Sequence, residues 1–370
     1  MKISAAVLHA TGEPFRIETL ELDPPRKGEV LVRMSAVGVC RSDLHLIKGD
    51  TDHPLPVVAG HEGAGIVEMV GEDVGHVAVG DHVTLNWAPA CLDCFYCDSG
   101  RPNLCETFLE PIWKGTLLDG TPRLSLGGRP VYHYCGLAAF ADHVVVPQQS
   151  CVRMDPEIPL TVCALIGCAV ATGVGAVLNT ADVPPGSTVT VFGAGGVGLS
   201  VIMGARLRKA AAVIAIDPSP QRRDLARQFG ATAAIDGDRD TVDRVRGLTS
   251  GRGSDYVFEA VGNPRVQEQC LAAARPGGTV VLAGLSAMGS QTDLPGAVLT
   301  RQEKTVKGSY YGTTDPARDF PLYGKYYLKG VLPLDRMISK TYSLDRINGA
   351  FDDLIRADAG RGLIVFDEAN

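Results

Sequence analysis

The segment TVTVFGAGGVGLS, residues Thr188–Ser200, decides the fold of this chain. Its first five residues, Thr188–Phe192, form an apolar run typical of a buried strand, and residues 197–210 continue with a helical pattern. A glycine-rich turn separates the two. A strand that passes through such a turn into a helix begins a β-α-β unit, so the sequence predicts a parallel sheet.

The glycine-rich turn predicts a dinucleotide site. Its G-x-G-x-x-G spacing runs through Gly193, Gly195, Gly196, Val197 and Gly198. Glycines let backbone N–H groups approach a pyrophosphate, and the helix N-terminus adds partial positive charge. Because the motif stands between a strand and a helix, we expect a nucleotide to bind there. The alternative is a turn that only packs the strand against the helix.

Asp217 and Arg222 bear on which dinucleotide binds. Asp217 directly follows the predicted strand Ala212–Ile216, nineteen residues after the last glycine of the motif. A carboxylate in this place can accept hydrogen bonds from the hydroxyls of an adenosine ribose and would repel a 2′-phosphate, which favours NAD over NADP. Arg222, one helical turn on, is a further candidate cofactor contact. The alternative for Asp217 is a helix cap before Pro218.

Strands and helices continue to alternate beyond Asp217. Residues 219–229 have a helical pattern, and Tyr256–Ala260 and Thr279–Ala283 are further apolar strands. The series fades after about residue 310. It predicts an α/β domain of the Rossmann type, a doubly wound parallel sheet, over residues 170–311.

The beginning of the chain has a different pattern, in which short β-rich runs alternate with glycine and proline. These runs are Glu29–Ala36, Ala64–Val70 and His82–Leu85. They predict a compact, mainly β domain over residues 1–169. Residues 312–370 look helical before a final strand at Gly362–Phe366, and we expect them to return to the first domain.

Composition and charge exclude several classes of protein. The chain has 370 residues, 45% of them hydrophobic and 21% charged, which suits two globular domains. Its net charge of −7 offers no basic surface for nucleic acid or anionic lipid. Met1–Leu8 is too short an apolar run for a signal peptide, and the uncharged, glycine-rich segment Thr161–Leu178 is interpreted as a buried helix. We therefore expect a cytoplasmic protein with no nucleic-acid or membrane partner.

Four of the ten cysteines crowd into one short segment, residues 87–106. Cys91, Cys94, Cys97 and Cys105 have the spacing C-x2-C-x2-C-x7-C. Four thiolates so placed can close a tetrahedron around zinc, and a closed site is structural. An iron–sulfur cluster is the alternative, but the spacing does not match the common ferredoxin patterns.

A second group of candidate metal ligands comes earlier. Cys40 and His61 are separated by a loop, as the ligands of a catalytic zinc site often are. Such a site needs a third ligand, and spacing does not choose among the remaining cysteines. These are Cys135, Cys151, Cys163, Cys168 and Cys270.

Together the three patterns resemble the zinc-containing medium-chain alcohol dehydrogenase family. The run G-H-E-x2-G-x5-G-x2-V at residues 60–74 matches the family's zinc signature, and the four-cysteine segment and the dinucleotide motif follow in the family's order. The resemblance spans nearly the whole chain. It implies a GroES-like, mainly β catalytic domain that carries a four-cysteine zinc lobe, beside a Rossmann domain.

The resemblance also implies a ligand set for the catalytic zinc. Cys40, His61 and Cys168 match the family's three ligands, which leaves the fourth position to substrate or water and brings the expected content to two zinc ions per chain. Glu62 lies beside the zinc in the family, close enough to exchange as a ligand. Asp43 would accept a hydrogen bond from the ring nitrogen of His61 that does not bind metal.

The family's mechanism assigns roles to two more residues. Zinc acts as a Lewis acid that lowers the pKa of a bound alcohol, and hydride passes to the nicotinamide. The alcohol proton would leave through the Ser42 hydroxyl, the nicotinamide ribose and His45.

By the same matching, three residues would surround the cofactor and the substrate. Arg41 matches the position that binds the pyrophosphate, Thr172 the position that meets the nicotinamide carboxamide, and Trp87 a position that often walls the substrate pocket with an aromatic ring. Trp87 and the small Ala139, taken as a further pocket residue, hint at an aromatic or medium-chain alcohol.

Several segments bear on the branch of the family. Phe108–Cys135 resembles the longer loop of the animal-type and glutathione-dependent branches, which favours a homodimer, with a tetramer as the alternative. Leu109 stands where the glutathione-dependent enzymes carry an arginine, and Ile364 where many relatives carry a second pyrophosphate-binding arginine. The run Gly308–Gly312, followed by Asp315, is similar to actinobacterial relatives that hold NAD tightly.

The expected function is therefore an NAD-dependent zinc alcohol dehydrogenase that oxidises a primary alcohol, medium-chain or aromatic, to the aldehyde. The alternatives are a thiol-dependent formaldehyde dehydrogenase and a carrier-linked alcohol dehydrogenase with tightly held NAD. A non-catalytic protein that binds NAD and zinc, and a zinc-lobed nucleic-acid binder, are the alternatives from other classes.

Overall fold

The computed structural model describes residues 1–356 and 360–366. The chain forms two compact units. The first comprises Met1–Cys168, Asp315–Arg356 and the end of the chain from Arg361, and the second is essentially Ala169–Thr314. Each unit has its own hydrophobic core.

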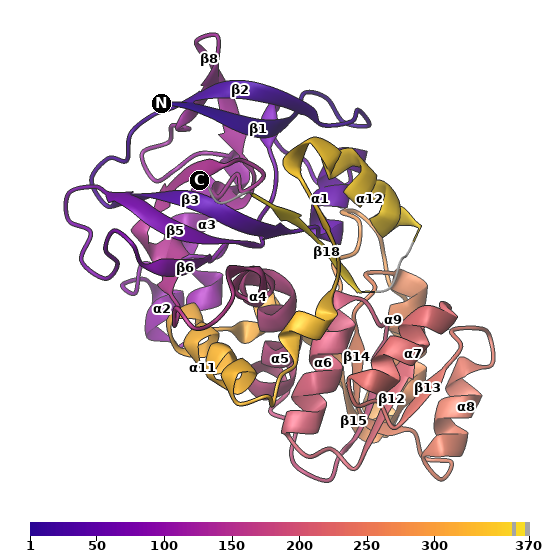
Figure 1. Ribbon diagram of the computed structural model, residues 1–370. Helices are drawn as coiled ribbons and strands as arrows, with labels where there is room; N and C mark the ends of the chain where they lie inside the picture. Colours follow the sequence, from indigo (N-terminus) through magenta and orange to yellow (C-terminus); the bar gives the residue numbers. More distant parts are fainter. Residues whose placement is uncertain (357–359, 367–370) are drawn as a thin grey trace. The chain divides into compact units, whose positions relative to one another are not determined.

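The first unit is built on two sets of strands (Figure 1). A closed barrel has the order β1-β2-β7-β8-β4. Its strands are β1 (Lys2–Leu8), β2 (Arg16–Leu22), β7 (Leu124–Leu126), β8 (Arg129–His133) and β4 (Val57–Val58). The predicted mainly β architecture of this part is confirmed.

A seven-stranded sheet completes the β structure of the first unit. Six strands follow the order β10-β6-β5-β3-β18-β17, and β9 also pairs with β3. Their bounds are β10 (Cys151–Arg153), β6 (His82–Leu85), β5 (Gly63–Val70), β3 (Glu29–Gly38), β18 (Arg361–Val365), β17 (Ile338–Tyr342) and β9 (His143–Pro147). The predicted strand at His82–Leu85 has the observed bounds, and the predicted strands Glu29–Ala36 and Ala64–Val70 agree with β3 and β5 within two residues at each end.

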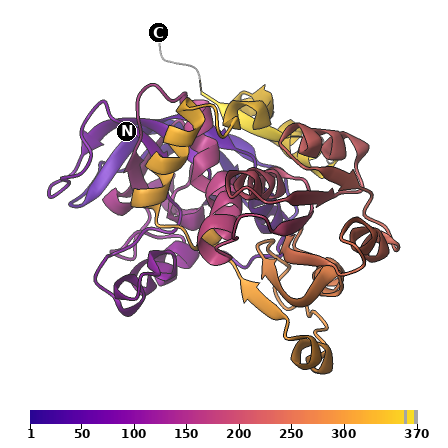
Figure 2. The same cartoon turned by 90° about the horizontal axis from the view of Figure 1, so that it is seen from below.

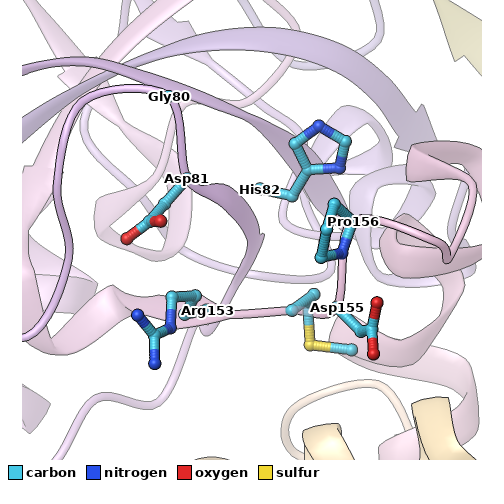
Figure 3. Close-up of a pocket in the computed structure, with 7 residues that line it drawn as sticks. Gly80, Asp81, His82, Arg153, Asp155 and Pro156 are labelled. Carbon is cyan, nitrogen blue, oxygen red and sulfur yellow. The ribbon is translucent and has the colours of Figure 1, made fainter.

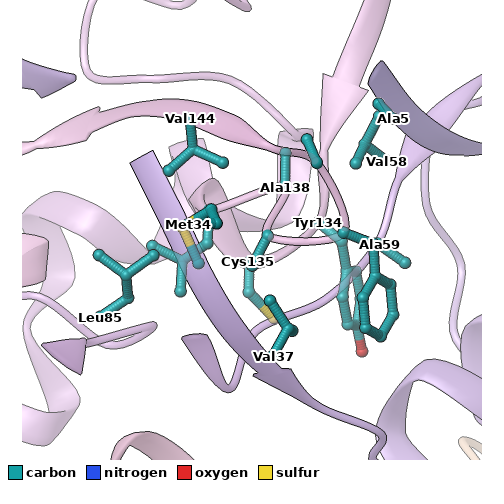
Figure 4. Close-up of a cluster of buried hydrophobic side chains, with 14 of the residues drawn as sticks. Ala5, Met34, Val37, Val58, Ala59, Leu85, Tyr134, Cys135, Ala138 and Val144 are labelled. Atoms are coloured by element: carbon teal, nitrogen blue, oxygen red, sulfur yellow. The ribbon is translucent and has the colours of Figure 1, made fainter. Parts of the chain in front are cut away.

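The central position of β3 explains its apolar sequence. It pairs with β5 along one side and with β9 and β18 along the other, so only Arg33 and Ser35 are partly exposed. Figure 4 shows part of the core that it lines, where Val37 lies near Cys135 and the Tyr134 ring lies beside Ala59. Such a strand, buried on both faces, reads as a continuous apolar run.

The helices of the first unit are mostly short. They are α1 (Arg41–Lys48), α2 (Phe95–Asp98), α3 (Glu106–Lys114), α11 (Pro316–Leu328) and α12 (Ile347–Ile355). The predicted helical character after residue 312 is confirmed for α11 and α12, whereas β17 was not predicted. The final strand begins at Arg361, one residue earlier than predicted.

The second unit is a six-stranded parallel sheet with helical connections (Figures 1 and 2). The order is β13-β12-β11-β14-β15-β16. The strands are β11 (Thr188–Phe192), β12 (Ala212–Ile216), β13 (Ala233–Ile235), β14 (Ser254–Glu259), β15 (Ala274–Leu282) and β16 (Thr305–Gly308). The connecting helices are α6 (Gly196–Leu207), α7 (Pro220–Gln228), α8 (Thr241–Leu248), α9 (Pro264–Ala273) and α10 (Gly296–Gln302).

This strand order confirms the predicted doubly wound sheet. Successive strands run from β11 outward to β13, and the chain then returns to pair β14 with the other side of β11. The order therefore reverses at β11, and ligands of such sheets bind beyond the carboxyl ends of the strands at this point. The glycine motif begins directly after β11.

One long helical run covers Leu160–Thr180 and includes α4 (Leu160–Leu165) and α5 (Ala171–Gly175), each followed by wider π-helical turns. Among the described residues it is the one helix long and apolar enough to span a membrane by length and composition, and 89% of its most apolar window is buried. That burial is typical of a core helix, as predicted for Thr161–Leu178.

Candidate active site and metal centres

The four lobe cysteines come together around one point. The sulfurs of Cys91, Cys94, Cys97 and Cys105 all lie within 4.8 Å of one another. Cys94 and Cys105 stand directly before α2 and α3, so the starts of two short helices position two of the four thiols. All four are free thiols.

The surroundings of these thiols suit a cation. Thr107 Oγ1 donates to Cys91 Sγ at 3.2 Å, and the Cys91 N–H donates to Cys105 Sγ at 3.3 Å. Backbone hydrogen bonding at Cys97 is the main cause that lowers the pKa of Cys94 to about 6, whereas burial raises the pKa of Cys97 to about 12. Neighbouring thiolates repel one another, and a divalent ion removes that repulsion, so the cluster fits a closed zinc site.

A second cluster is assembled from three distant segments of the first unit. The ligand atoms of Cys40, His61 and Cys168 lie within 4.8 Å of one another, and all three residues are buried. Cys40 lies two residues after β3 and directly before α1, His61 lies just before β5, and Cys168 belongs to the long helical run. Of the five cysteines that spacing left open, Cys168 is the one that the fold brings to Cys40 and His61.

Asp43 orients the imidazole of His61. Its Oδ1 lies 3.1 Å from His61 Nδ1 and accepts the Gly60 N–H at 2.9 Å. This contact leaves Nε2 of His61 for a metal ion. Burial alone would lower the pKa of His61, but the negative charges of Asp43, Cys168 and Cys40 raise it well above its usual value. A field that holds a proton on a buried imidazole also favours a metal cation.

Glu62 is fully buried and paired with Arg361. A side chain at Gly38 would collide with it, because an added Cβ would lie 2.5 Å from Glu62 Cδ. Burial raises the pKa of Glu62 to about 7, although Arg361 opposes the shift. Glu62 Oε1 is buried without a protein partner among the described residues, so one carboxylate oxygen remains available beside the ligand cluster.

Arg361 is a charged residue of this region that the sequence analysis did not assign. It lies on β18 and pairs with Glu62. Ile364 of the same strand is fully buried and lies opposite Val37. Nothing local in the sequence predicts the pair, because the burial of Glu62, which calls for a basic partner, is a property of the fold.

Ser42 and His45 lie three residues apart on α1, a spacing that puts two side chains on one face of a helix. Ser42 Oγ lies 3.8 Å from Cys40 Sγ, next to the ligand cluster. His45 is partly exposed, and its Nδ1 lies 2.9 Å from Asp50 Oδ2. The two residues therefore span from the buried ligands toward the surface. Arg41, also on α1, is exposed.

Two aromatic rings border His61. The Trp87 ring meets it edge to face at 6.4 Å between centroids, and the Tyr134 ring does so at 5.7 Å. Tyr134, which also donates from its hydroxyl to the Ser42 carbonyl at 3.3 Å, was not singled out from the sequence. Ala139 is fully buried in the hydrophobic core and its N–H donates to the Gly60 carbonyl, so its described contacts are those of a packing residue.

In the second unit, the backbone of the glycine motif is accessible at the place where a ligand is expected to bind. Gly193 has φ +92°, and a Cβ at Gly198 would lie 1.7 Å from the Gly193 carbonyl oxygen, so both positions require glycine. A Cβ at Gly195 would meet nothing within 4 Å. Helix α6 begins at Gly196 and continues through Val197, which directs the helix N-terminus toward this open space.

Asp217 is buried, and its carboxylate stabilises the glycine turn by accepting a backbone hydrogen bond from it. Its Oδ2 accepts the Ala194 N–H at 2.9 Å, and its Oδ1 accepts the Ser219 N–H at 2.9 Å. Arg223 Nη1 donates to the Asp217 carbonyl at 2.7 Å, and the Arg222 N–H donates to Ser219 Oγ at 3.4 Å. The helix cap of α7 is Ser219 and not Asp217. The Asp217 carboxylate supports the glycine turn, and its role toward a ribose stays a prediction.

A pocket on the first unit lies apart from the predicted chemistry. It has a volume of about 430 Å³ and is lined by Gly80–His82 and Arg153–Pro156 (Figure 3). In Figure 3 the carboxylates of Asp81 and Asp155 point away from each other, and each accepts an N–H of its own loop, from Ala78 and Glu157. None of the predicted site residues lines it, so it is not the candidate active site.

Comparison with known proteins agrees with this geometry. Residues 26–156 match the alcohol dehydrogenase GroES-like domain, and residues 196–323 match the zinc-binding dehydrogenase family. The chain is 40% identical to the NDMA-dependent alcohol dehydrogenase of Amycolatopsis methanolica over 99% of both chains. It is 41% identical to an S-(hydroxymethyl)glutathione dehydrogenase of Escherichia coli over 95% of this chain and 96% of that one.

A solved structure extends the comparison to three dimensions. Benzyl alcohol dehydrogenase from Acinetobacter calcoaceticus superposes with a TM-score of 0.94 at 30% identity, covering 99% of this chain and 100% of that one. Two domain matches, full-length relatives and the clustered metal ligands lead to one conclusion. This protein belongs to the zinc-binding alcohol dehydrogenase family and is an oxidoreductase of that class.

Proposed function

We propose that the protein transfers hydride reversibly from a primary alcohol, medium-chain or aromatic, to NAD and so forms the aldehyde. One observation carries this proposal: two thiols and one imidazole, all buried, are gathered within 4.8 Å in Cys40, His61 and Cys168. Three protein ligands with an open fourth position are the donor set of a catalytic zinc ion, whereas structural sites use four. When bound there, zinc supplies a Lewis acid that makes the alcohol hydroxyl more acidic.

Side chains of the first unit would carry the proton of the alcohol to solvent. Asp43 holds His61 in the tautomer that presents Nε2 to the ligand cluster. The Ser42 hydroxyl would take the proton of the alcohol and pass one on through the nicotinamide ribose to His45, which lies beside Asp50 and would release it to solvent. The alcohol thus loses one hydride to the nicotinamide and one proton to this relay, which balances its oxidation to an aldehyde. Glu62 would be an alternative ligand of the catalytic zinc.

The same proposal assigns two zinc ions and NAD. Cys91, Cys94, Cys97 and Cys105 would hold the second zinc, which would have a structural role. NAD is favoured because the nearly buried Asp217 carboxylate stands at the end of β12, where it would repel a 2′-phosphate. The backbone of the glycine motif would hold the pyrophosphate; its residues are Gly193, Gly195, Gly196, Val197 and Gly198. By the family resemblance, Arg41 would bind the pyrophosphate, Thr172 would meet the carboxamide and Arg222 would be a further cofactor contact. The first unit would be the catalytic domain and the second the NAD domain; the bounds expected from the sequence, 1–169 with 312–370 and 170–311, differ from these units by one to three residues.

Trp87 supports an aromatic or medium-chain substrate, because its ring and that of Tyr134 border His61. An S-hydroxymethyl thiol is the second candidate, favoured by the similarity to the Escherichia coli glutathione-linked enzyme. Leu109, a half-exposed apolar residue where that branch carries arginine, argues against an anionic thiol adduct. Ala139 is buried in the hydrophobic core, so it would support the substrate-binding residues from behind.

We further propose a cytoplasmic homodimer. The edge strand β16 pairs only with β15 among the described residues, so its other edge can pair with a second chain. A sedimentation measurement that finds a monomer would reject this.

Initial rates test the function directly. Ethanol, hexanol, benzyl alcohol and S-hydroxymethyl thiols are offered with NAD or NADP, and zinc is measured on the same preparation. We expect about two zinc ions per chain and the highest kcat/KM for benzyl alcohol or hexanol with NAD. A preparation that carries both zinc ions and oxidises none of these alcohols would reject the proposal.

A further inference from the structure

A strained turn follows the last strand of the second unit. Tyr311, Gly312 and Thr313 have φ values of 55°, 66° and 51°, so three successive residues are left-handed. Glycine adopts this conformation readily, but tyrosine and threonine do so at a cost in free energy. Such strain persists only where the surrounding structure holds it, and it concentrates at sites that bind ligands.

Three hydroxyl groups hold this turn in place. Thr180 Oγ1 lies 2.8 Å from Ser309 Oγ and 2.7 Å from Thr313 Oγ1. Thr180 ends the long helical run, more than a hundred residues before its partners, and the Ser309 N–H is fixed by the Leu282 carbonyl at 2.9 Å. We call Thr180, Ser309 and Thr313 the hydroxyl clasp. Thr180 has one hydroxyl proton, so it donates to one partner and accepts from the other.

The clasped turn packs against the helical turn that carries Thr172. A Cβ at Gly312 would lie 2.3 Å from the Ala171 carbonyl oxygen and 2.8 Å from the Thr172 carbonyl oxygen. Thr314 Oγ1 also donates to the Ala171 carbonyl at 3.2 Å. A shift of the turn would therefore move the Thr172 segment with it.

The Thr172 segment is linked in turn to the glycine motif. Helix α5 packs on α6 so closely that a Cβ at Gly173 would lie 2.4 Å from the Val197 carbonyl oxygen. Val197 belongs to the first turn of α6, directly after the open backbone at Gly195. The clasp, Thr172 and the glycine motif are thus joined by direct packing, and the turn follows the carboxyl end of β16, the side of the sheet where ligands bind.

We propose that the hydroxyl clasp is a set of positioning residues that fixes the Thr172 segment against the dinucleotide and slows its release. This inference rests on the proposed function, because it takes NAD as the ligand of the second unit. The clasp residues act through Thr172 and the turn. Their loss should change binding of the dinucleotide and leave the metal ligands of the first unit as they are.

Two matched pairs of variants test the clasp. Thr180→Val keeps the shape of the side chain and removes both hydrogen bonds, whereas Thr180→Ser keeps the hydroxyl. Ser309→Ala removes one bond of the clasp, and Ser254→Ala removes the hydroxyl that lies 2.6 Å from Thr190 Oγ1 at the amino end of β14. The rate of NADH release is followed by its fluorescence in stopped flow, and KM is measured separately for NAD and for the alcohol.

We expect Thr180→Val to release NADH about tenfold faster and to raise KM for NAD by a similar factor. The alcohol KM and the zinc content should stay within about twofold of the wild type, and Thr180→Ser should restore most of the NADH affinity. Ser309→Ala should have a smaller effect of the same kind, and adding it to Thr180→Val should change little more, since both remove one shared bond.

Other outcomes overturn the clasp. If Thr180→Val and Ser254→Ala change NADH release equally, or neither changes it, the hydroxyls only stabilise the fold. Should Thr180→Val not fold, Ser309→Ala against Ser254→Ala gives the same decision. A wild-type protein that binds NADH but oxidises no alcohol would reject the proposed function and still report on the clasp through the release rate.

Discussion

The two cysteine clusters of the first unit are built in opposite ways. The lobe takes four ligands from fifteen consecutive residues, Cys91–Cys105, and three of them are only partly buried. The other cluster takes Cys40, His61 and Cys168 from separate elements and buries all three. A local cluster can stabilise its own segment, whereas a dispersed one depends on the whole fold and leaves a ligand position open. This difference is the basis for proposing the lobe as a structural site and the dispersed cluster as the catalytic one.

The sharpest test of this contrast is Cys40→Ser. We expect activity to fall by about 10³-fold or more, since the Lewis acid contributes several kcal/mol to the reaction. The four-cysteine lobe should keep its zinc, so metal analysis of the variant should fall from about two ions per chain to about one. Full activity with one zinc ion would show that the lobe, and not the buried cluster, serves catalysis.

Cys94→Ser tests the role of the four-cysteine lobe. Removal of one lobe ligand should release the structural zinc and lower Tm by about 5 °C or more, because metal binding contributes directly to folding. At a temperature where the variant is folded, kcat should change by less than about threefold. The matched control is Cys163→Ala, a buried cysteine outside both clusters. A variant that is stable but inactive would contradict the division of roles.

Asp43→Asn asks whether the buried cluster needs its orienting carboxylate. An amide can still contact His61 Nδ1 but no longer supplies the negative charge, and loss of such a partner typically costs about 10–100-fold in metal affinity or activity. Titration with a zinc chelator should strip the buried site of the variant first, while the lobe zinc resists as in the wild type. Equal resistance at both sites would remove Asp43 from the metal site.

The smallest effect is expected for His45→Gln. The residue lies at the solvent side of α1 beside Asp50, and water can take over part of its role, so kcat should fall by about tenfold. Zinc content and stability should be unchanged. Added imidazole should recover part of the lost rate, which a merely structural role would not allow. A kcat that matches the wild type across pH would exclude His45 from the relay.

The fold could be predicted to the extent that its elements have local patterns. The strands Thr188–Phe192 and Ala212–Ile216 were predicted with their observed bounds, because buried parallel strands are continuous apolar runs between clear breaks. Several strands were not predicted, among them β13 and β17. Ala233–Ile235 has only three residues, and Ile338–Tyr342 is mostly exposed, so neither has an apolar pattern of its own. Tertiary pairing decides both.

The residues of the candidate site also differ in whether the sequence alone identifies them. The four lobe cysteines are visible from spacing alone, and the glycine motif is visible from its position after a strand. The third ligand of the buried cluster was not, because Cys168 is one of five cysteines with no local signature and required the family resemblance. Arg361 and Tyr134 were missed because the fold alone brings them beside Glu62 and His61.

The pairing of Glu62 with Arg361 has a consequence for the order of events in the cell. The two residues stand 299 positions apart, and β18, which carries Arg361, pairs with β3, so Glu62 gains its basic partner only once the chain as far as β18 has been made. The four lobe cysteines lie within fifteen residues and can come together much earlier in synthesis. Closure of the buried cluster is therefore a later step of folding than closure of the lobe.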